Sequence, residues 1–184
     1  KFFSREQVPM IPCHGLEDGV CTCRKGRNCP SPGKHPLMAN WQGAASTDEA
    51  KVLSWFSSSK PVNLAIATGR KNSSGKHLLA VDADKIDHPF IAQLREHGTT
   101  VTQRSGSGGS HALYWSDVPV RNSCQLLDEK VDIRGSGGIL VIAPSTHKSG
   151  RQYEFTCDLK SIKIQQIPAF LEAKLVSSAN AVKE

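Results

Sequence analysis

Two aspartates lie one residue apart at the end of an apolar run, the segment 78–84 with the sequence LLAVDAD. If this run is a β-strand, Asp82 and Asp84 project from the same face about 7 Å apart, because successive side chains point to opposite faces. Carboxylates this close repel each other unless they are protonated or neutralised, and Mg²⁺ or Mn²⁺ neutralises them through oxygen ligands. The pair therefore predicts a divalent-cation site; the alternative is a strand that ends in a solvated turn.

A third acid, Asp132, lies in the strand-like run 131–134, which a glycine-rich sequence follows. In a strand Asp132 and Arg134 share one face, so the carboxylate can join the metal site while the guanidinium binds phosphate. A surface ion pair between these two residues is the alternative. The turn 143–150 follows, and we interpret its Ser145 and His147 as further nucleotide contacts.

A loop with almost no large side chains, QRSGSGGSH at 103–111, joins two further strand-like runs. Its glycines let backbone N–H groups approach an anion closely, and His111 can hydrogen-bond a phosphate or sugar oxygen. Plain hairpins also use such loops. Because this loop follows the acidic pair in the chain, the sequence favours a cradle for a triphosphate.

Potential soft metal ligands gather near the N-terminus, at Cys13, His14, Cys21, Cys23, Cys29 and His35. A disulfide framework would distribute its cysteines across the fold, so this clustering predicts a metal site. A structural zinc ion needs four ligands. We expect Cys23, Cys29 and His35, with the fourth from Cys21 or His14; unligated thiols on a loop are the alternative. The basic sequence RKGR at 24–27 either guides DNA or forms a solvated turn.

The elements that must position these residues are mostly strands. We expect strands at 63–68, 77–84, 99–105, 111–115, 131–134, 139–143 and 152–156. Helices are predicted at 46–57, at 86–97 and from Pro168 onward, the first with Val52, Leu53 and Phe56 on one face. The turn-rich segment 69–75 predicts a hairpin between the first two strands, and 12–36 reads as an irregular loop. The pattern is that of a mixed α/β sheet protein.

Composition adds broad limits. The chain has 184 residues, 38% of them hydrophobic, which is enough for one main core. No apolar run approaches the roughly 20 residues that span a bilayer, so we expect a cytoplasmic protein with no membrane partner. A net charge of +6 suits a polyanionic partner but is also common in other proteins. The first residue is not Met, so we expect a fragment of a longer protein.

The motifs and their order resemble the bifunctional DNA primase/polymerase (prim-pol) N-terminal domain family of the archaeo-eukaryotic primase superfamily. The motifs are LLAVDAD, SGSGGSH, KVDIRGSGG and VIAPSTHKSG, and the upstream SPGKHP looks like the family's opening segment. The resemblance spans about residues 30–155. It implies that Asp82, Asp84 and Asp132 hold two Mg²⁺ or Mn²⁺ ions and that His111 contacts the incoming nucleotide. The full set of expected nucleotide contacts is Lys34, Arg104, Ser107, Gly108, Gly109, His111, Arg134, Ser145 and His147.

The resemblance also implies an α+β fold, in which an RRM-like catalytic core packs against an N-terminal α/β unit with a small zinc-binding loop at about 12–36. The catalytic domain is expected over 1–165. A C-terminal helix over 166–184 would lead to further domains, and this family often carries a helicase module there. In such proteins a loop with Cys and His precedes the GKHP segment, which supports His35 as a zinc ligand.

The function implied is template-dependent nucleotidyl transfer from NTP or dNTP, on single-stranded DNA template and primer, by a two-metal mechanism. Replication of a plasmid, virus or mobile element is the expected setting. A two-metal nuclease is one alternative, although it has no need for the glycine-rich triphosphate loops. A zinc-bearing nucleic-acid-binding module without catalysis is the other, although all three acids are intact.

Overall fold

A computed structural model describes the backbone of residues 1–181 and, except at Leu126 and at 176–181, their side chains. The helices are α1 (Phe2–Arg5), α2 (Trp41–Ala44), α3 (Glu49–Ser54), α4 (Pro89–Glu96) and α5 (Ala169–Ala181), and the 3-10 turn η1 covers Gly26–Asn28. The strands are β1 (Met10–His14), β2 (Leu16–Glu17), β3 (Val20–Cys21), β4 (Val62–Ala67), β5 (His77–Ala83), β6 (Thr102–Arg104), β7 (Ser110–Ser116), β8 (Ser123–Asp128), β9 (Val131–Arg134), β10 (Ile139–Ile142), β11 (Glu154–Phe155) and β12 (Gln165–Gln166). This is a mixed α+β fold with a sheet-rich core and few helices, as predicted.

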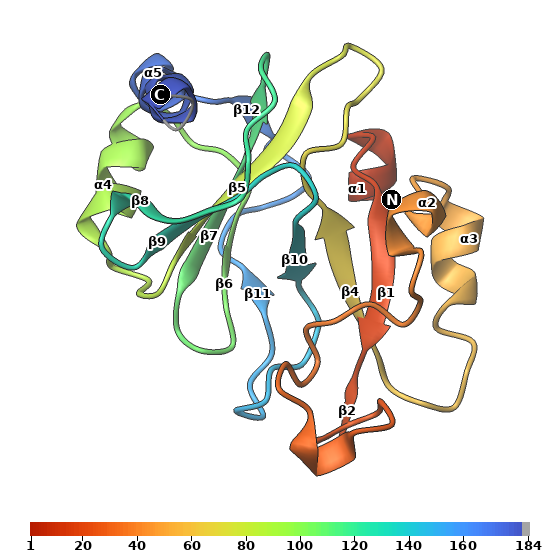
Figure 1. Cartoon of the computed structure of the whole chain (residues 1–184). Coiled ribbons are helices and arrows are strands. Elements are labelled where there is room, and N and C mark those ends of the chain that lie inside the picture. The colour runs from red at the N-terminus through yellow and green to blue at the C-terminus, as the bar shows by residue number, and fades with distance from the viewer. Residues whose placement is uncertain (182–184) are drawn as a thin grey trace.

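The strands form one large sheet, one small sheet and a short hairpin. The large sheet has the order β11-β6-β7-β5-β9-β8, with β12 beside β7, and the small sheet has the order β1-β4-β10. The hairpin joins β2 to β3 and forms the projection at the bottom of Figure 1, which we call the N-terminal lobe and define as residues 15–35. Helices α4 and α5 lie on the outer side of the large sheet, and α1 to α3 lie beside the small sheet (Figure 1).

The two faces of the large sheet differ because side chains alternate along each strand. Leu79, Val81 and Ala83 of β5 face one way and pack in a cluster with Phe90 and Leu94 of α4. The same cluster includes Ile167, Leu171 and Leu175, so helix α5 packs on the same face of the large sheet as α4. The opposite face therefore carries the alternate residues of each strand.

That opposite face has an apolar half and a polar half. Leu78 and Ala80 of β5, with Leu113 and Trp115 of β7, pack in a second cluster with small-sheet residues such as Ile66. Farther along the same strands the apolar residues give way to Asp82 and His111. The small sheet therefore covers one end of this face, and the polar end is left for a site.

Several elements differ from the sequence prediction. The prediction of a hairpin between 63–68 and 77–84 is wrong. Strand β4 pairs with β1 and β10, whereas β5 pairs with β7 and β9. The chain turns through 69–76 from one sheet into the other. Segment 12–36 is not an irregular loop throughout, since it contains the end of β1 and the β2–β3 hairpin.

The first long predicted helix is shorter than expected. Helix α3 covers only Glu49–Ser54, and Asp48 caps it by accepting a hydrogen bond from the backbone N–H of Lys51 at 2.8 Å. With fewer than two turns, α3 buries Val52 but leaves Leu53 and Phe56 exposed.

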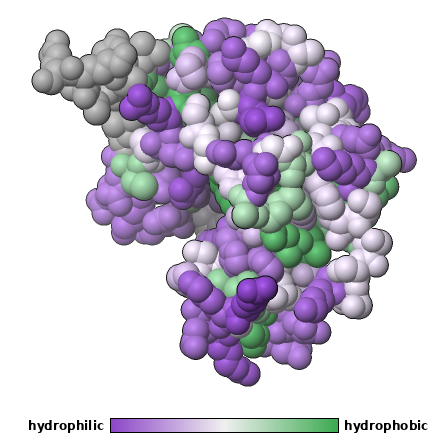
Figure 2. Space-filling model, turned by 45° about the vertical axis from the view of Figure 1, so that its right-hand side comes forward, coloured by the Kyte–Doolittle hydropathy of each residue, from purple (hydrophilic) through white to green (hydrophobic). Residues whose placement is uncertain are grey.

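The surface is largely hydrophilic on the face shown in Figure 2. Among the described helices, none combines the length and hydrophobicity needed to cross a membrane.

Candidate functional site

A row of polar side chains crosses four neighbouring strands at the open end of the large sheet. Asp82 on β5 pairs in register with His111 on β7 and with Asp132 on β9, and His111 pairs in turn with Gln103 on β6. Directly opposed residues in antiparallel strands lie about 5 Å apart. The alternation of each strand therefore places all four side chains on one face, next to one another.

Asp82 lies at the centre of this row and both of its oxygens are bound. Its Oδ1 lies 3.2 Å from His111 Nε2. Its Oδ2 accepts from Nη2 and Nε of Arg134, at 2.9 and 3.1 Å. The same Nη2 also donates to Oδ2 of Asp132 at 3.0 Å, so one guanidinium joins two of the three predicted acids.

The electrostatic setting keeps Asp82 ionised. Burial alone would raise the pKa of Asp82, but the hydrogen bond from His111 and the charge and hydrogen bonds of Arg134 outweigh it and lower the pKa to about 2. Its side chain still retains 21% of its exposure. Asp82 is therefore an ionised and partly accessible carboxylate at neutral pH.

The glycine-rich loop between β6 and β7 packs on the end of β5. A Cβ atom at Gly109 would lie 2.4 Å from the carbonyl oxygen of Ala83, so only glycine allows this approach. The Ser105 hydroxyl accepts from the backbone N–H of Gly109 at 2.9 Å and lies 2.9 Å from the Ser107 hydroxyl. These contacts bring the loop beside Asp84, which is exposed just beyond the end of the strand.

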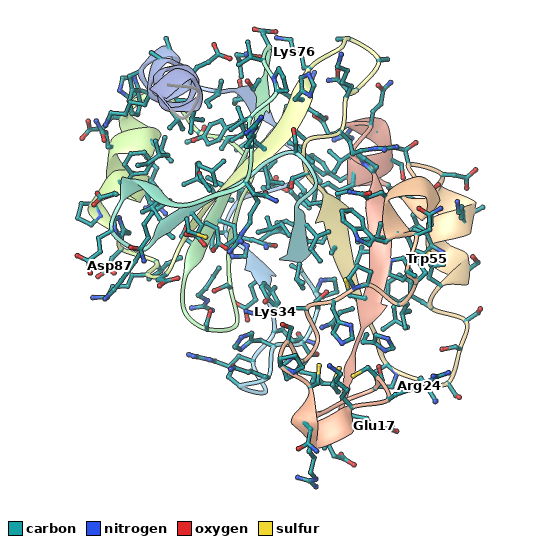
Figure 3. The ribbon with its side chains drawn as sticks, in the orientation of Figure 1. Glu17, Arg24, Lys34, Trp55, Lys76 and Asp87 are labelled. Carbon is teal, nitrogen blue, oxygen red and sulfur yellow. The ribbon has the colours of Figure 1, made fainter. Side chains whose placement is uncertain are left out.

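A pocket of about 310 Å³ lies over this face. Its polar lining consists of Lys34, Asp82, Asp84, Ser105, Ser107, His111, Arg134 and Tyr153, and its apolar lining of Ile139, Leu140 and Val141. Figure 3 shows Lys34 near the middle of the molecule, at the upper end of the N-terminal lobe. Residues from the lobe, the large sheet and β10 thus meet in one pocket.

Positive charge gathers at one side of the pocket. Burial and the nearby charges of Lys148 and Arg134 lower the pKa of Lys34, against the opposing effect of Asp82 and Asp84. Burial also lowers the pKa of His147, together with Lys34, Lys148 and Arg151. Cations this close destabilise one another's charge, so the region favours binding an anion.

The other predicted contacts lie elsewhere. Arg104 is exposed, forms an ion pair with Glu154 and does not line the pocket. Ser145 is buried, and its hydroxyl bonds both the N–H and the carbonyl of Leu64 at 2.8 and 3.1 Å, which ties the chain after β10 to β4. His147 is buried against the glycine loop, since a Cβ at Gly106 would lie 2.2 Å from His147 Cβ.

A second cluster of potential ligands lies in the N-terminal lobe. The ligand atoms of Cys21, Cys23, Cys29 and His35 all lie within 4.8 Å of one another, and no other group of three or more such residues in the described chain does so. Nε2 of His35 lies 3.5 Å from Sγ of Cys21 and 3.4 Å from Sγ of Cys29. Three thiols and one imidazole match the ligand set of a structural zinc site, so this cluster could hold zinc.

The structure separates two other candidates from this cluster. His14 stacks on His35 with ring centroids 4.6 Å apart, and its Nδ1 lies 3.2 Å from the Thr22 hydroxyl. Cys13 is fully buried in β1, and burial raises the pKa of its thiol to about 12. Of the two residues considered for the fourth ligand, Cys21 belongs to the cluster and His14 does not.

Comparison with known protein families decides the family. Residues 1–170 match the family described as bifunctional DNA primase/polymerase, N-terminal. The chain belongs to this family. A comparison with curated proteins gives no match. Family membership supports a primase/polymerase-type function, that is a nucleotidyltransferase with DNA and nucleotides as substrates.

In this primase/polymerase domain the three acids do not form a closed metal cage. Asp82 and Asp132 share Arg134, and Asp84 stands apart beyond the strand end. The donor set fits a hard divalent cation, because all three side chains offer carboxylate oxygens at the open end of one sheet. A cation bound to Asp82 and Asp132 would have to share these carboxylates with Arg134 or displace it.

Sequence reasoning missed two residues of this primase/polymerase domain: Gln103, which bonds His111 but does not line the pocket, and Tyr153, which lines it. Gln103 is 2% exposed and bonds His111, and the only signal for it was its position in an alternating strand before the glycine loop. Tyr153 lies with its ring centroid 6.0 Å from that of His111, and burial raises the pKa of its hydroxyl. Tyr153 comes from a segment distant in sequence, so no local pattern pointed to it.

Proposed function

We propose that this domain transfers nucleotides from NTP or dNTP to a DNA primer on a single-stranded template, in the replication of a plasmid, virus or mobile element. The observation that carries the proposal is the row of His111, Asp82 and Asp132 across adjacent strands. Beside this row lies the glycine-rich loop, whose close approach to β5 requires glycine at position 109. The family match supports it independently. The cations Lys34 and Arg134 line the same pocket as Asp82 and Asp84, and this mixture of charges suits a substrate with phosphates and a reacting hydroxyl.

Asp82, Asp84 and Asp132 would hold Mg²⁺ or Mn²⁺ in this proposal. When bound, two such ions supply activation of the primer 3′-hydroxyl and neutralisation of the triphosphate. The chain's own part is to keep these carboxylates ionised and in place. For Asp82 this follows from its lowered pKa and from its two hydrogen-bonding partners, His111 and Arg134.

The triphosphate would lie along the glycine loop. The residues that line the pocket on that side are Ser105, Ser107 and Lys34, and Lys148 lies close enough to lower the pKa of Lys34. Arg134 would hold phosphate oxygens once its carboxylate partners bind metal. Arg104 and Ser145 have no part in this proposal, because their side chains are bound outside the pocket.

The fold supports the proposal at a coarser level. We interpret the large, mostly antiparallel sheet, with α4 and α5 on one face and the acids on the other, as the RRM-like catalytic core. The small sheet with α1 to α3 would then be the N-terminal α/β unit. The catalytic unit would cover 1–165 and the following helix would lead to other modules, such as a helicase, in a longer chain.

A primer-extension assay tests the proposal. The wild-type domain is expected to extend a primer on a single-stranded template in Mg²⁺ or Mn²⁺, and Asp82→Ala and Asp132→Ala are each expected to abolish incorporation while circular dichroism remains unchanged. Asp87→Ala serves as the control, because Asp87 is an exposed aspartate outside the pocket. A folded Asp82→Ala variant with near-normal extension would contradict the proposal.

The same experiment separates the alternatives. Shortening of the labelled strand without extension would favour a two-metal nuclease. Binding of DNA with no metal-dependent affinity for a nucleoside triphosphate would favour a binding module without catalysis. De novo priming, tested with ribo- and deoxynucleotides, extends the assay to primase activity.

A further inference from the structure

The Gln103 side chain joins the two sheets at the edge of the pocket. It projects from β6 of the large sheet toward β10, which is an edge strand of the small sheet. Its Oε1 accepts from the backbone N–H of Ala143 at 3.0 Å, and its Nε2 donates to the backbone carbonyl of Val141 at 2.8 Å. The amide therefore pairs with the open edge of β10 much as a peptide group of a neighbouring strand would.

These two backbone partners fix which way the amide points. A backbone N–H can only donate and a carbonyl can only accept, so the amide oxygen must face Ala143 and the amide nitrogen must face Val141. A reversed amide would place two donors together and two acceptors together in a buried place. Such unsatisfied groups are costly when buried, so this orientation is strongly favoured.

The fixed amide decides the state of His111. The second hydrogen of Gln103 Nε2 points to His111 Nδ1 at 2.7 Å, so that nitrogen must accept and carries no proton. The proton of the neutral ring is then on Nε2, which lies 3.2 Å from Oδ1 of Asp82. The chain of donors thus runs from the amide to the imidazole and from the imidazole to the carboxylate.

We propose that Gln103 is a positioning residue that holds His111 as the Nε2–H tautomer, with this N–H directed at Asp82 and the pocket. In solution the two neutral tautomers of an imidazole interconvert. The ionised Asp82 carboxylate can only accept from Nε2 and so favours the same tautomer, and Gln103 adds to this by placing a donor at Nδ1 that excludes a proton there. The donor presented to the pocket is therefore set both by Asp82, which lines the pocket, and by Gln103, which does not. Its effect on nucleotide transfer rests on the function proposed above; the tautomer itself does not.

Nuclear magnetic resonance of the histidine rings tests the tautomer directly. Long-range nitrogen–proton correlation spectra of the ¹⁵N-histidine-labelled domain distinguish a protonated ring nitrogen from a bare one. At about pH 8, where an ordinary imidazole is neutral, His111 is expected to show a bare Nδ1 and a protonated Nε2. The signal is assigned by its loss in His111→Ala. A protonated Nδ1 in the wild-type domain would overturn the proposal, whatever any variant does.

Two substitutions change the amide without greatly changing its size. Gln103→Met removes the donor that excludes a proton from Nδ1 and leaves only Asp82 to favour the Nε2–H tautomer, so a fraction of the Nδ1–H tautomer is expected to appear. Gln103→Glu replaces the donor with an acceptor, so Nδ1 of His111 is expected to become protonated. The melting temperature and the amide spectrum of each variant show whether it is folded. A folded Gln103→Met domain with only the Nε2–H tautomer would overturn the proposal.

Kinetics connect the tautomer to the reaction. Gln103→Met is expected to lower kcat/KM for the nucleotide on the order of tenfold, because the donor is misdirected in part of the molecules. Gln103→Glu is expected to lower kcat/KM by at least as much. If the two variants are equally stable, a role of Gln103 only in holding β10 would not predict this loss. The expected tautomer in a wild-type domain without polymerase activity would refute the proposed function and leave the positioning role intact.

Discussion

Asp82 links the electrostatics of the pocket to the stability of the fold. Its pKa in the folded state is about 2, below the ordinary value of 3.8, because His111 and Arg134 favour the ionised form in spite of burial. A lowered pKa means that the unfolded chain binds the proton more tightly. The resulting stabilisation is therefore fully present above about pH 4 and is lost as the pH falls from about 4 to about 2.

The substitution Asp82→Asn tests this linkage. At pH 6 without added Mg²⁺ it is expected to lower the free energy of unfolding by on the order of 2 kcal/mol, since each unit of pKa shift is worth about 1.4 kcal/mol. Urea unfolding between pH 2 and pH 6 measures the difference, which is expected to shrink toward zero near the bottom of this range. Asp87→Asn provides the control at an exposed position. A difference that stays constant with pH would contradict the assignment.

The glycine loop between β6 and β7 depends on close approach rather than on backbone freedom at Gly109. A Cβ there would meet the Ala83 carbonyl at 2.4 Å, so Gly109→Ala must push the loop away from β5. Gly75 offers the opposite case, because it has φ of +78° and no atom within 4 Å of a Cβ. The two glycines separate steric contact from backbone strain.

We expect Gly109→Ala to destabilise the domain more than Gly75→Ala, which should cost about 1 kcal/mol through its left-handed backbone. Gly109→Ala should also raise the KM for nucleotide, because the displaced loop lines the pocket, whereas Gly75→Ala should leave it unchanged. Urea unfolding and steady-state extension kinetics measure the two effects. Equal stability losses with an unchanged KM would show that the loop can move without consequence.

The N-terminal lobe has too little secondary structure to hold its own shape. Its hairpin pairs only Leu16 with Cys21 and Glu17 with Val20, and short two-stranded hairpins are marginally stable in water. The arrangement of Cys21, Cys23, Cys29 and His35 therefore needs another source of stability. A bound zinc ion is the source that this ligand set suits.

Metal analysis and proteolysis test the lobe. The purified domain is expected to contain about one zinc ion per chain, because the described residues form one such cluster. Cys29→Ser should lose the metal and unfold the lobe, so that trypsin cleaves rapidly after Arg24, Lys25 and Arg27, which are exposed but held in place in the folded lobe. Cys124→Ser should change neither property, because Cys124 is an exposed cysteine of β8 outside the cluster. Absence of zinc from the wild-type domain would refute this interpretation.

The predictable part of the site is the part that local alternation encodes. Asp82, Asp132 and Arg134 fall on one face because each lies in a short strand with buried neighbours, a pattern visible in sequence. The partner of a strand is not encoded in this way. Gln103 bonds β10, and β4 and β5 lie in different sheets instead of pairing. Both results follow from the packing of the two sheets against each other, which depends on residues far apart in the chain. Exposure of Leu53 and Phe56 likewise follows from the short length of α3.

The whole molecule carries a net charge of +6, and part of the excess lies on the N-terminal lobe. Arg24, Lys25 and Arg27 are exposed there, and Figure 3 shows Arg24 on the lobe below Lys34. A single strand that leaves the pocket past Lys34 would therefore run over these cations. Each phosphate contact releases counterions, so such a path contributes to the salt dependence of binding.

Replacing Arg24, Lys25 and Arg27 together with alanine tests this path. If all three side chains contact phosphates, the slope of log K against log salt should fall in magnitude by about 2, because each contact on a single strand contributes about 0.7. The matched control replaces Lys51, Arg70 and Lys71, which are exposed on α3 and on the turn after β4, outside the lobe. Both triple variants lower the net charge equally, so long-range attraction alone predicts the same change in each. A flatter slope only in the lobe variant identifies local contact with DNA. An equal change of slope in the two variants would indicate that the basic sequence is a solvated turn.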